Sequence, residues 1–204
     1  MLTLYGMSDS GNCYKPRLLL ALLNRPFRHV EINALDGSTR QPDFLARNPN
    51  GQVPLLELED GRLLWESNAI LLYLAEGTAF LPDEPYLRAI VCQWLFFEQY
   101  SHEPYIAVRR ALIRYPERAA EATPARLSST LDKGHHALAV MERRLAANRF
   151  MTGETCTVAD IALYPYTRDA RYAGFEMDRF PAISTWLDRI EAQPGHVPMT
   201  WLPR

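Results

Sequence analysis

The segment from Asn48 to Leu74 constrains the fold more than any other part of this chain: NPNGQVPLLELEDGRLLWESNAILLYL. Val53-Pro54 favours the start of a strand, because proline removes no ladder hydrogen bond there. The apolar residues that follow, as far as Leu58, are typical of a strand covered on both faces. Asp60-Gly61 is a strong hairpin-turn signal. The segment therefore predicts a strand, a tight turn and a second strand in quick succession.

Glu66-Ser67 follows the hairpin and precedes an apolar helix expected over Asn68–Leu74. A serine at a helix start caps the helix, and the unpaired N–H groups there also bind anions. The main chain of Val53 offers an exposed backbone edge to which an extended peptide can add as a strand. Together these features predict a place for a small peptide that has a free carboxylate and a free amine.

The residues before this segment predict a strand–helix–strand unit. Leu2–Tyr5 and Phe27–Asn33 have strand character, and Cys13–Leu23 has helical character with Pro16 in its first turn. Leucines on nearly all sides of that helix imply deep burial. The order βαβ followed by ββα is typical of a thioredoxin-like layered sandwich.

Strand signals stop after Glu76–Pro85, a turn-rich stretch without periodicity. A long helical region is expected over Tyr86–Tyr115, in which Trp94–Phe97 form an apolar girdle suited to a bundle core or a subunit contact. Further apolar stripes at helical spacing begin at Leu127 and Ile183. The second half therefore predicts an all-α domain.

Thr157 and Asp160 precede another apolar helix and form a predicted capping box, in which hydroxyl and carboxylate bind helix-start N–H groups. A catalytic acid role for Asp160 is the weaker interpretation.

The chain of 204 residues is long enough for two modest domains. We expect them at 1–77 and 86–204, joined by a linker at 78–85. A net charge of −2 without a basic block argues against nucleic acid as a partner. No apolar run reaches the ~20 residues that span a bilayer, so no membrane partner is expected.

Three cysteines, Cys13, Cys92 and Cys156, are too few and too scattered for a disulfide framework. The first residues also lack the basic and apolar regions of a secretion signal. The expected location is the cytoplasm.

The loop from Ser8 to Lys15, SDSGNCYK, holds the candidate reactive groups. Ser10 offers a hydroxyl, Asn12 an amide, and Cys13 a thiol at a helix start, where cysteines are acidified. Ser10 and Cys13 have the spacing of a C-x-x-C pair whose first cysteine is replaced, so an ordinary dithiol cycle is not available to this loop.

These patterns resemble the cytosolic glutathione transferase family. Its pattern NP-x-x-x-VP-x-L, then DG, then L-x-ES-x-A-I-x-x-YL is present almost position for position, and the resemblance covers essentially the whole chain. The reactive loop resembles the Ser-type, theta-like loop of bacterial members. The resemblance implies an α/β thioredoxin-like N-terminal domain plus an all-α helical-bundle C-terminal domain. It also implies a cytoplasmic homodimer that uses glutathione as co-substrate, without a metal, to detoxify a small hydrophobic electrophile.

The resemblance also implies roles for individual residues. Ser10 would hold the glutathione thiol as thiolate, while Asn12 and Cys13 remain alternatives for that role. Alignment on Pro16 places Asn12, not Cys13, where some bacterial members have a cysteine. The implied glutathione contacts are Arg40 and Gln52 to the glycine carboxylate, Val53 and a cis Pro54 to the cysteine main chain, Glu66 to the γ-glutamyl ammonium, and Ser67 to the γ-glutamyl carboxylate.

A second-substrate pocket is expected to use Tyr100, His102, Tyr105 and Arg109. Tyr14 and Lys15 are expected at the pocket mouth or the solvent face. His135-His136 are expected at the surface, because adjacent helical residues point ~100° apart and do not easily share one metal ion.

Two other functions stay open at this point. A glutathione-dependent disulfide oxidoreductase is possible if glutathione supplies the thiol that the loop lacks. A non-catalytic glutathione-binding or regulatory protein of the same fold is the third possibility, since fold does not fix function.

Overall fold

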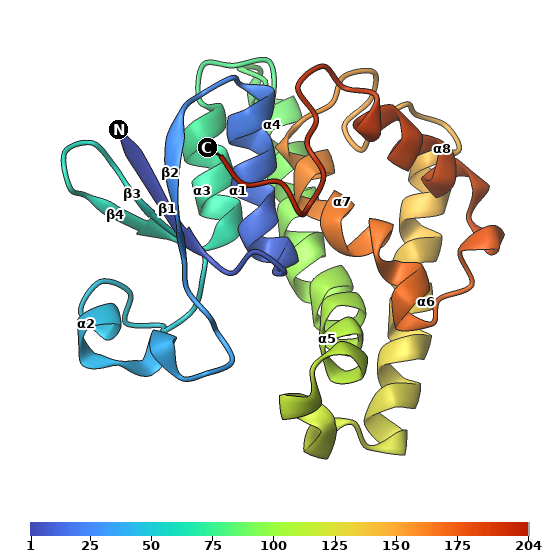
Figure 1. The fold of residues 1–204 in the computed structure, drawn as a ribbon. Helices are drawn as coiled ribbons and strands as arrows, with labels where there is room; N and C mark the ends of the chain where they lie inside the picture. Colours follow the sequence, from blue (N-terminus) through green and yellow to red (C-terminus); the bar gives the residue numbers. More distant parts are fainter. Residues whose placement is uncertain (204) are drawn as a thin grey trace. The chain divides into compact units, whose positions relative to one another are not determined.

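The computed structural model describes residues 1–203 and divides into two compact units (Figure 1). The first unit comprises Met1–Glu76 together with the chain from Gln193 onward, and the second comprises Gly77–Ala192. The first boundary lies one residue before the expected end at 77, whereas the chain from Gln193 is grouped with the first unit. The chain from Gln193 belongs with the first unit, because two side chains of its first helix bind main-chain carbonyls of this segment.

Residues 78–85, which the sequence predicts to be a linker, are grouped with the second unit. Leu81 is buried, and the carbonyl of Phe80 accepts a hydrogen bond from the N–H of Val158 at 2.9 Å. These contacts fix the segment at the start of a helix within its own unit.

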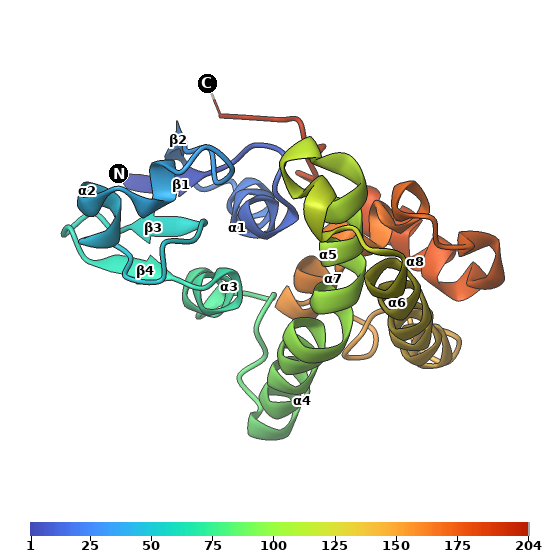
Figure 2. The same ribbon diagram turned by 90° about the horizontal axis from the view of Figure 1, so that it is seen from below.

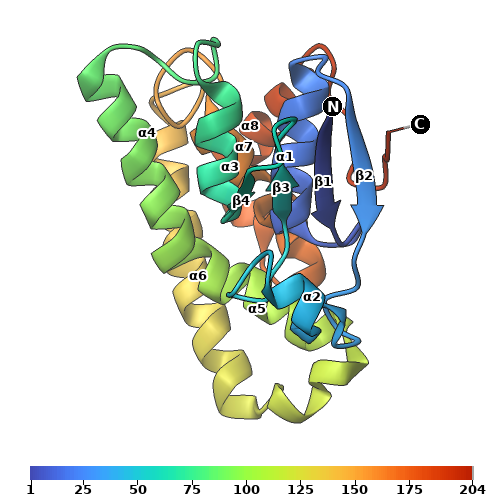
Figure 3. The same cartoon turned by 90° about the vertical axis from the view of Figure 1, so that its left-hand side faces the viewer.

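A four-stranded mixed sheet in the order β2-β1-β3-β4 forms the first unit. β1 is parallel to β2, as the arrows in Figure 3 show, and antiparallel to β3, which forms a hairpin with β4. The elements are β1 (Leu2–Gly6), α1 (Gly11–Leu22), β2 (Phe27–Glu31), η1 (Ser38–Arg40), α2 (Pro42–Leu45), β3 (Leu55–Glu57), β4 (Leu63–Trp65) and α3 (Ser67–Ala75). The thioredoxin-like prediction is confirmed.

The sheet is covered on both faces. α1 and α3 lie side by side on one face (Figure 2). On the other face Tyr5 and Leu55 pack with Phe44 of α2 in one apolar cluster. Side chains alternate along a strand, so the fully buried Leu4 and Leu56 point toward the α1 and α3 face.

Helix α1 begins two residues earlier than the sequence indicates. The Ser10 side chain accepts a hydrogen bond from the N–H of Cys13, which caps the helix and lets it start at Gly11. Pro16 consequently lies inside the helix and not in its first turn.

The regular elements of the second unit are all helices among its described residues, and an isolated β-bridge joins Phe150 to Gly153. Its elements are α4 (Pro85–Phe97), η2 (Glu98–His102), α5 (Glu103–Arg114), η3 (Pro116–Glu121), α6 (Pro124–Leu145), α7 (Val158–Arg168), η4 (Ala170–Ala173), η5 (Met177–Arg179) and α8 (Pro181–Glu191). The single helix expected over Tyr86–Tyr115 is interrupted at η2, a π-helical turn. α7 forms the core of the unit, since every residue from Val158 to Thr167 is buried.

Thr157 and Asp160 form a capping box at the start of α7. The buried Asp160 carboxylate also accepts from the N–H of Met151 at 2.8 Å and from the indole N–H of Trp186 at 2.9 Å. Burial raises the pKa of Asp160, and these hydrogen bonds oppose that rise. Asp160 therefore joins the start of α7 to a preceding turn and to α8, which is a structural role.

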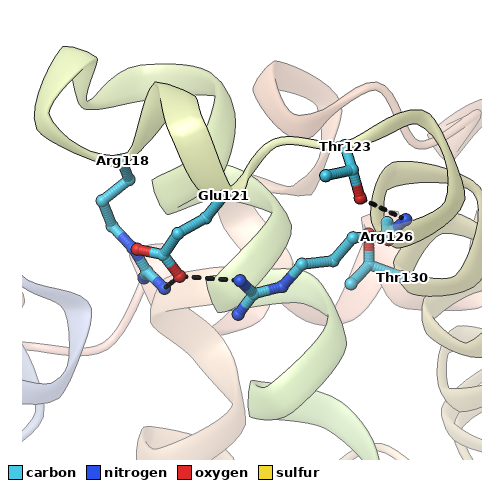
Figure 4. Close-up of polar contacts among 5 residues, drawn as sticks. All are labelled: Arg118, Glu121, Thr123, Arg126 and Thr130. Carbon is cyan, nitrogen blue, oxygen red and sulfur yellow. Dashed lines mark hydrogen bonds and ion pairs between the residues drawn. The ribbon is translucent and has the colours of Figure 1, made fainter.

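A polar cluster orders the connection from α5 to α6 (Figure 4). Glu121 pairs with Arg118 through two hydrogen bonds of 2.9 Å and with Arg126 at 2.6 Å. Thr123 caps α6 by accepting from the N–H of Arg126, and Thr130 bonds the carbonyl of Arg126. The two arginines lower the pKa of Glu121 to about 2.

Candidate functional site

Ser10 ends the loop between β1 and α1. Its Oγ accepts from the N–H of Cys13 at 3.3 Å, and its N–H donates to the carbonyl of Met7 at 3.1 Å. A hydroxyl has two acceptor lone pairs and one O–H donor. The capping bond therefore leaves the O–H of Ser10 able to donate to an anion, and the capping and thiolate roles are compatible.

Cys13 does not have the environment of a reactive cysteine. The side chain is fully buried, and burial raises the pKa of its thiol to about 11, with a smaller opposing contribution from the Ser10 hydrogen bond. The expected acidification at the helix start is thus outweighed by desolvation. A Cβ at Gly6 would lie 3.1 Å from the Cys13 sulfur, so the thiol packs tightly beneath the loop. Asn12, the second residue of α1, is only half buried.

A chain of polar contacts links two of the predicted glutathione contacts. The Arg40 guanidinium donates to the carbonyl of Asn50 at 3.2 Å. The Asn50 amide donates in turn to the carboxylate of Glu66 at 3.4 Å. Arg40 and Glu66, which are far apart in the sequence, are therefore brought to the same part of the first unit.

Val53 precedes β3 by two residues, and β3 pairs its Leu55 with Trp65, the residue before Glu66. Within residues 1–203, no group donates to or accepts from the N–H or C=O of Val53. The Val53-Pro54 peptide bond is cis. The Asn48 side chain holds the preceding turn by donating to the carbonyl of Gln52 at 2.7 Å and accepting from the N–H of Asn50 at 3.0 Å. This arrangement leaves an unpaired backbone edge next to β3.

Ser67 is buried at the start of α3, and its hydroxyl accepts from the Lys15 ammonium at 3.3 Å. Lys15 also donates to the Asn68 side chain at 3.5 Å. Tyr14 and Lys15 are fully buried, which corrects their expected place at the pocket mouth or solvent face. Because α1 packs on α3, Lys15 reaches the helix start beside Ser67.

Glu66 has a backbone φ of 71°, in a region that non-glycine residues rarely adopt. Such conformations persist where the surrounding structure imposes them, and they cluster at ligand sites. Here the conformation turns the chain from β4 into α3 and leaves the carboxylate exposed beside Asn50.

The four second-substrate candidates divide into two pairs. His102 is fully buried and bonds Thr167 at 2.8 Å, and Arg109 donates to the carbonyls of Ala173 and Leu127. Burial lowers the pKa of Arg109. These two side chains are engaged inside the helical unit, which their sequence positions did not reveal. Tyr100 is 80% exposed, and Tyr105 is half buried against Lys133.

Sequence reasoning missed Asn48 and Asn50, and it did not foresee the contact of Lys15 with Ser67. The first two could have been found, because an asparagine before proline and glycine signals a side-chain-stabilised turn. Lys15 carries no such signal, since its burial depends on how α1 packs.

A cavity of about 580 Å³ lies elsewhere in the first unit. Its walls include Asn24, Phe27, Val197 and Trp201, and none of the predicted glutathione contacts. The cavity therefore does not mark the glutathione site.

The described residues contain no group of three or more His, Cys, Asp or Glu side chains that could hold a metal ion. His135 is half buried and packs edge-on against Phe175, while His136 is exposed. Among residues 1–203, no helix combines the length and apolar character needed to cross a membrane.

Comparisons with known proteins decide the family. A model described as glutathione S-transferase, N-terminal domain, matches residues 1–76, and one described as glutathione S-transferase, C-terminal domain, matches residues 117–189. Over its full length the chain is 30% identical to glutathione S-transferase GstB of Escherichia coli K12, covering 99% of that protein. The chain belongs to the glutathione S-transferase family.

Two further comparisons bear on fold and function. A crystal structure of a glutathione S-transferase from Pseudomonas fluorescens Pf-5 is 49% identical, with a TM-score of 0.94 over 97% of this chain and 98% of that one. The disulfide-bond oxidoreductase YfcG of Escherichia coli K12 is 28% identical over 96% of this chain and 92% of that protein. The family includes enzymes named for both types of reaction that the sequence left open.

Proposed function

We propose that this member of the glutathione S-transferase family activates the thiol of glutathione and directs it at a small hydrophobic electrophile. One observation carries the proposal: the main chain of Val53 is unpaired, two residues before Leu55, which pairs with Trp65 next to Glu66. Arg40, Glu66 and Ser67 have the chemistry to bind the ends of a γ-glutamyl peptide.

In this proposal glutathione adds as a short strand to the main chain of Val53, next to the cis Pro54. Ser67 and the N–H groups at the start of α3 bind the γ-glutamyl carboxylate, and Glu66 accepts from the γ-glutamyl ammonium. Arg40 and Gln52 bind the glycine carboxylate. Each end of the peptide then meets a group of opposite charge or a hydrogen-bond donor.

Ser10 is the proposed thiolate donor. A free thiol has a pKa near ~8.5 and is mostly protonated at neutral pH. A hydroxyl that donates to the sulfur stabilises the anion, and α1 begins at this position with its positive end toward the loop. Asn12 is an assisting donor. Cys13 is not assigned a role in thiolate formation, because burial keeps its thiol protonated.

The electrophile is proposed to contact Tyr100 and Tyr105, the two candidates whose side chains reach the surface. We further propose a cytoplasmic homodimer with a detoxifying role. These parts of the proposal are supported by the family and by the exposed aromatic side chains of α4 and η2.

A glutathione-dependent disulfide oxidoreductase is the second candidate function, and the similarity to YfcG favours it. In that reaction the glutathione thiolate would attack a disulfide and form a mixed disulfide, with the departing thiolate as leaving group. A second glutathione thiolate would then attack the glutathione sulfur of the mixed disulfide, which releases the substrate's remaining half as a thiolate and forms oxidised glutathione.

The test is a panel of halide, epoxide, peroxide and disulfide substrates, each assayed with glutathione on the wild-type protein and the Ser10→Ala variant. Turnover of halides or epoxides that depends on Ser10 supports the transferase. Turnover of disulfides alone supports the second candidate. Glutathione binding without turnover of any class would contradict both and indicate a binding protein.

A further inference from the structure

We propose that Arg17 is a positioning residue that couples the C-terminal segment, Gln193–Pro203, to the loop that presents Ser10. The inference rests on the proposed role of Ser10 and adds a determinant outside the glutathione contacts.

Arg17 lies on α1 and is fully buried. One of its terminal nitrogens donates both to the carbonyl of Ser8 at 2.9 Å and to the carbonyl of Met199 at 2.6 Å. Ser8 belongs to the reactive loop and Met199 to the C-terminal segment. A single guanidinium group therefore joins two parts of the chain that are far apart in the sequence.

The loop is also held from its other side. The N–H of Ser8 donates to the Glu31 carboxylate at 2.9 Å, and the second oxygen of Glu31 pairs with His29 at 2.9 Å. Both peptide groups of Ser8 are thus fixed by charged side chains, and charge-assisted hydrogen bonds are stronger than neutral ones. Since Ser10 follows two residues later, this clamp sets where its hydroxyl lies.

Two further contacts anchor the C-terminal segment. The Tyr14 hydroxyl donates to the carbonyl of Val197 at 2.6 Å, and Trp201 packs against Phe27 with ring centroids 6.2 Å apart. Tyr14 and Arg17 are three residues apart on α1 and therefore lie on one face of the helix. The segment runs along this face and supplies carbonyls to both side chains.

Two donor atoms of Arg17, Nε and Nη1, have no hydrogen-bond partner among the described residues. The carbonyl of Met199 that the C-terminal segment supplies is therefore important for keeping this guanidinium group buried. A buried cation is costly unless its donors are paired. Without the segment, Arg17 loses the carbonyl of Met199 and becomes accessible to water. We expect it then to leave Ser8, which loosens the loop and misplaces Ser10.

Three variants test the coupling: Arg17→Lys, Trp201→Ala, and a chain that ends at Gly195. Arg17→Lys keeps the charge but has no planar fork to hold two carbonyls. The shortened chain keeps Arg17 and removes the carbonyls. Arg144→Met is the matched control, because Arg144 also donates to a main-chain carbonyl, that of Met151 at 2.9 Å, but in the helical unit.

The first measurement is the pH midpoint of the thiol of bound glutathione, together with KM for glutathione. We expect Arg17→Lys and the shortened chain to raise the midpoint by about half a unit or more, while KM changes less than about threefold. Trp201→Ala should give a smaller shift in the same direction. The control variant Arg144→Met should leave the pH midpoint of the bound thiol unchanged. A midpoint equal to wild type in both stronger variants, with the proteins folded, overturns the coupling.

The second measurement is amide hydrogen exchange in the peptide covering residues 7–13, compared with peptides from α6. We expect faster exchange in the loop of the shortened chain and unchanged exchange in α6. Unchanged exchange in the loop overturns the inference. The hydrogen-exchange measurement does not depend on catalysis and so tests the coupling alone. The proposed function would instead be contradicted if the pKa of the bound glutathione thiol is not lowered in the wild-type protein.

Discussion

Two serines at helix starts, Ser10 and Ser67, have separate tasks in the proposed binding of glutathione. Ser67 accepts from Lys15, so its own O–H is left to donate toward the γ-glutamyl carboxylate. Ser10 accepts from the main chain at the start of α1, so its O–H is left for the sulfur. The Ser67 hydroxyl should govern the affinity for glutathione, and the Ser10 hydroxyl should govern the ionisation of the glutathione thiol.

Ser67→Ala should weaken glutathione binding by ~1.5–3 kcal/mol, the cost of one hydrogen bond to a charged group. Isothermal titration calorimetry measures this directly. Ser184→Ala is the control, because that hydroxyl donates to the carbonyl of Phe180 just before α8 in the helical unit and should leave affinity unchanged. If Ser67→Ala and Glu66→Ala both bind glutathione as wild type does, the assigned site is wrong.

At the residue scale, sequence reasoning located Ser10 and Ser67 because helix starts have recognisable chemistry. It misplaced Tyr14 and Lys15 for one physical reason. The helix that carries them is apolar nearly all round, so its periodicity does not indicate which residues face α3 or the C-terminal segment. The roles of Ser10, Asn12 and all the predicted glutathione contacts remain predictions.

At the scale of elements, α6 shows how packing overrides helix propensity. Gly134 lies in its middle, where alanine would normally be favoured by ~1 kcal/mol. A Cβ there would lie 2.5 Å from the ring of Phe175 and 3.3 Å from Ile106. We expect Gly134→Ala to lower the free energy of unfolding by about 1–3 kcal/mol. Urea unfolding measures it, with the exposed Ser129→Ala as control; a stabilised Gly134→Ala would contradict this packing.

The connection between α5 and α6 should respond to acid. The folded-state pKa of Glu121, about 2, lies below the value of 4.5 for a free side chain. Ionised Glu121 therefore stabilises the fold above about pH 4.5, and this contribution is lost as pH falls through 4.5 toward 2.

Urea unfolding of wild type and Glu121→Gln at pH 7 and at pH 3 checks this expectation. The difference in unfolding free energy should be larger at pH 7 and should shrink at pH 3. Glu117→Gln, at an exposed position in the same segment, should show no such dependence. An equal difference for Glu121→Gln at both pH values would rule out the assigned role of this carboxylate.

The helices themselves were largely predictable from apolar spacing, but the break at η2 was not. Pro104, at the start of α5, was a signal that the apolar spacing did not contain, because proline inside a helix removes a hydrogen bond and clashes with the carbonyl four residues earlier. The π-helical turn there contains the buried side chains of Glu98 and His102. Their burial depends on tertiary packing, which local spacing does not indicate.

At the scale of the whole molecule, the least predictable feature was the return of the chain from Gln193 to the first unit. Its principal polar contacts use the carbonyls of Val197 and Met199, and main-chain groups leave no residue-type signal in a sequence.

We also predict a homodimer. Trp94 and Leu95 are buried within the helical unit, so the girdle expected to drive association is only partly available. Phe96 and Tyr100 remain 66% and 80% exposed on α4 and η2. Sedimentation at micromolar concentration should show a dimer for wild type and a shift toward monomer for Phe96→Asp. A wild-type monomer of 23.4 kDa would exclude the dimer.

The central claim is that Ser10 lowers the pKa of the glutathione thiol. Ultraviolet titration of thiolate absorbance in the glutathione complex measures that pKa for wild type, Ser10→Ala, Asn12→Ala and Cys13→Ser. Thr123→Ala is the control for loss of a helix cap alone, because its side chain caps α6 at the same distance of 3.3 Å.

We expect Ser10→Ala to raise the midpoint by roughly one unit or more and to reduce activity near neutral pH about tenfold, with little change in glutathione affinity. Asn12→Ala should have a smaller effect, and Cys13→Ser and Thr123→Ala should have almost none. An unmoved midpoint in Ser10→Ala, with a shift in Asn12→Ala or Cys13→Ser, would contradict the assignment.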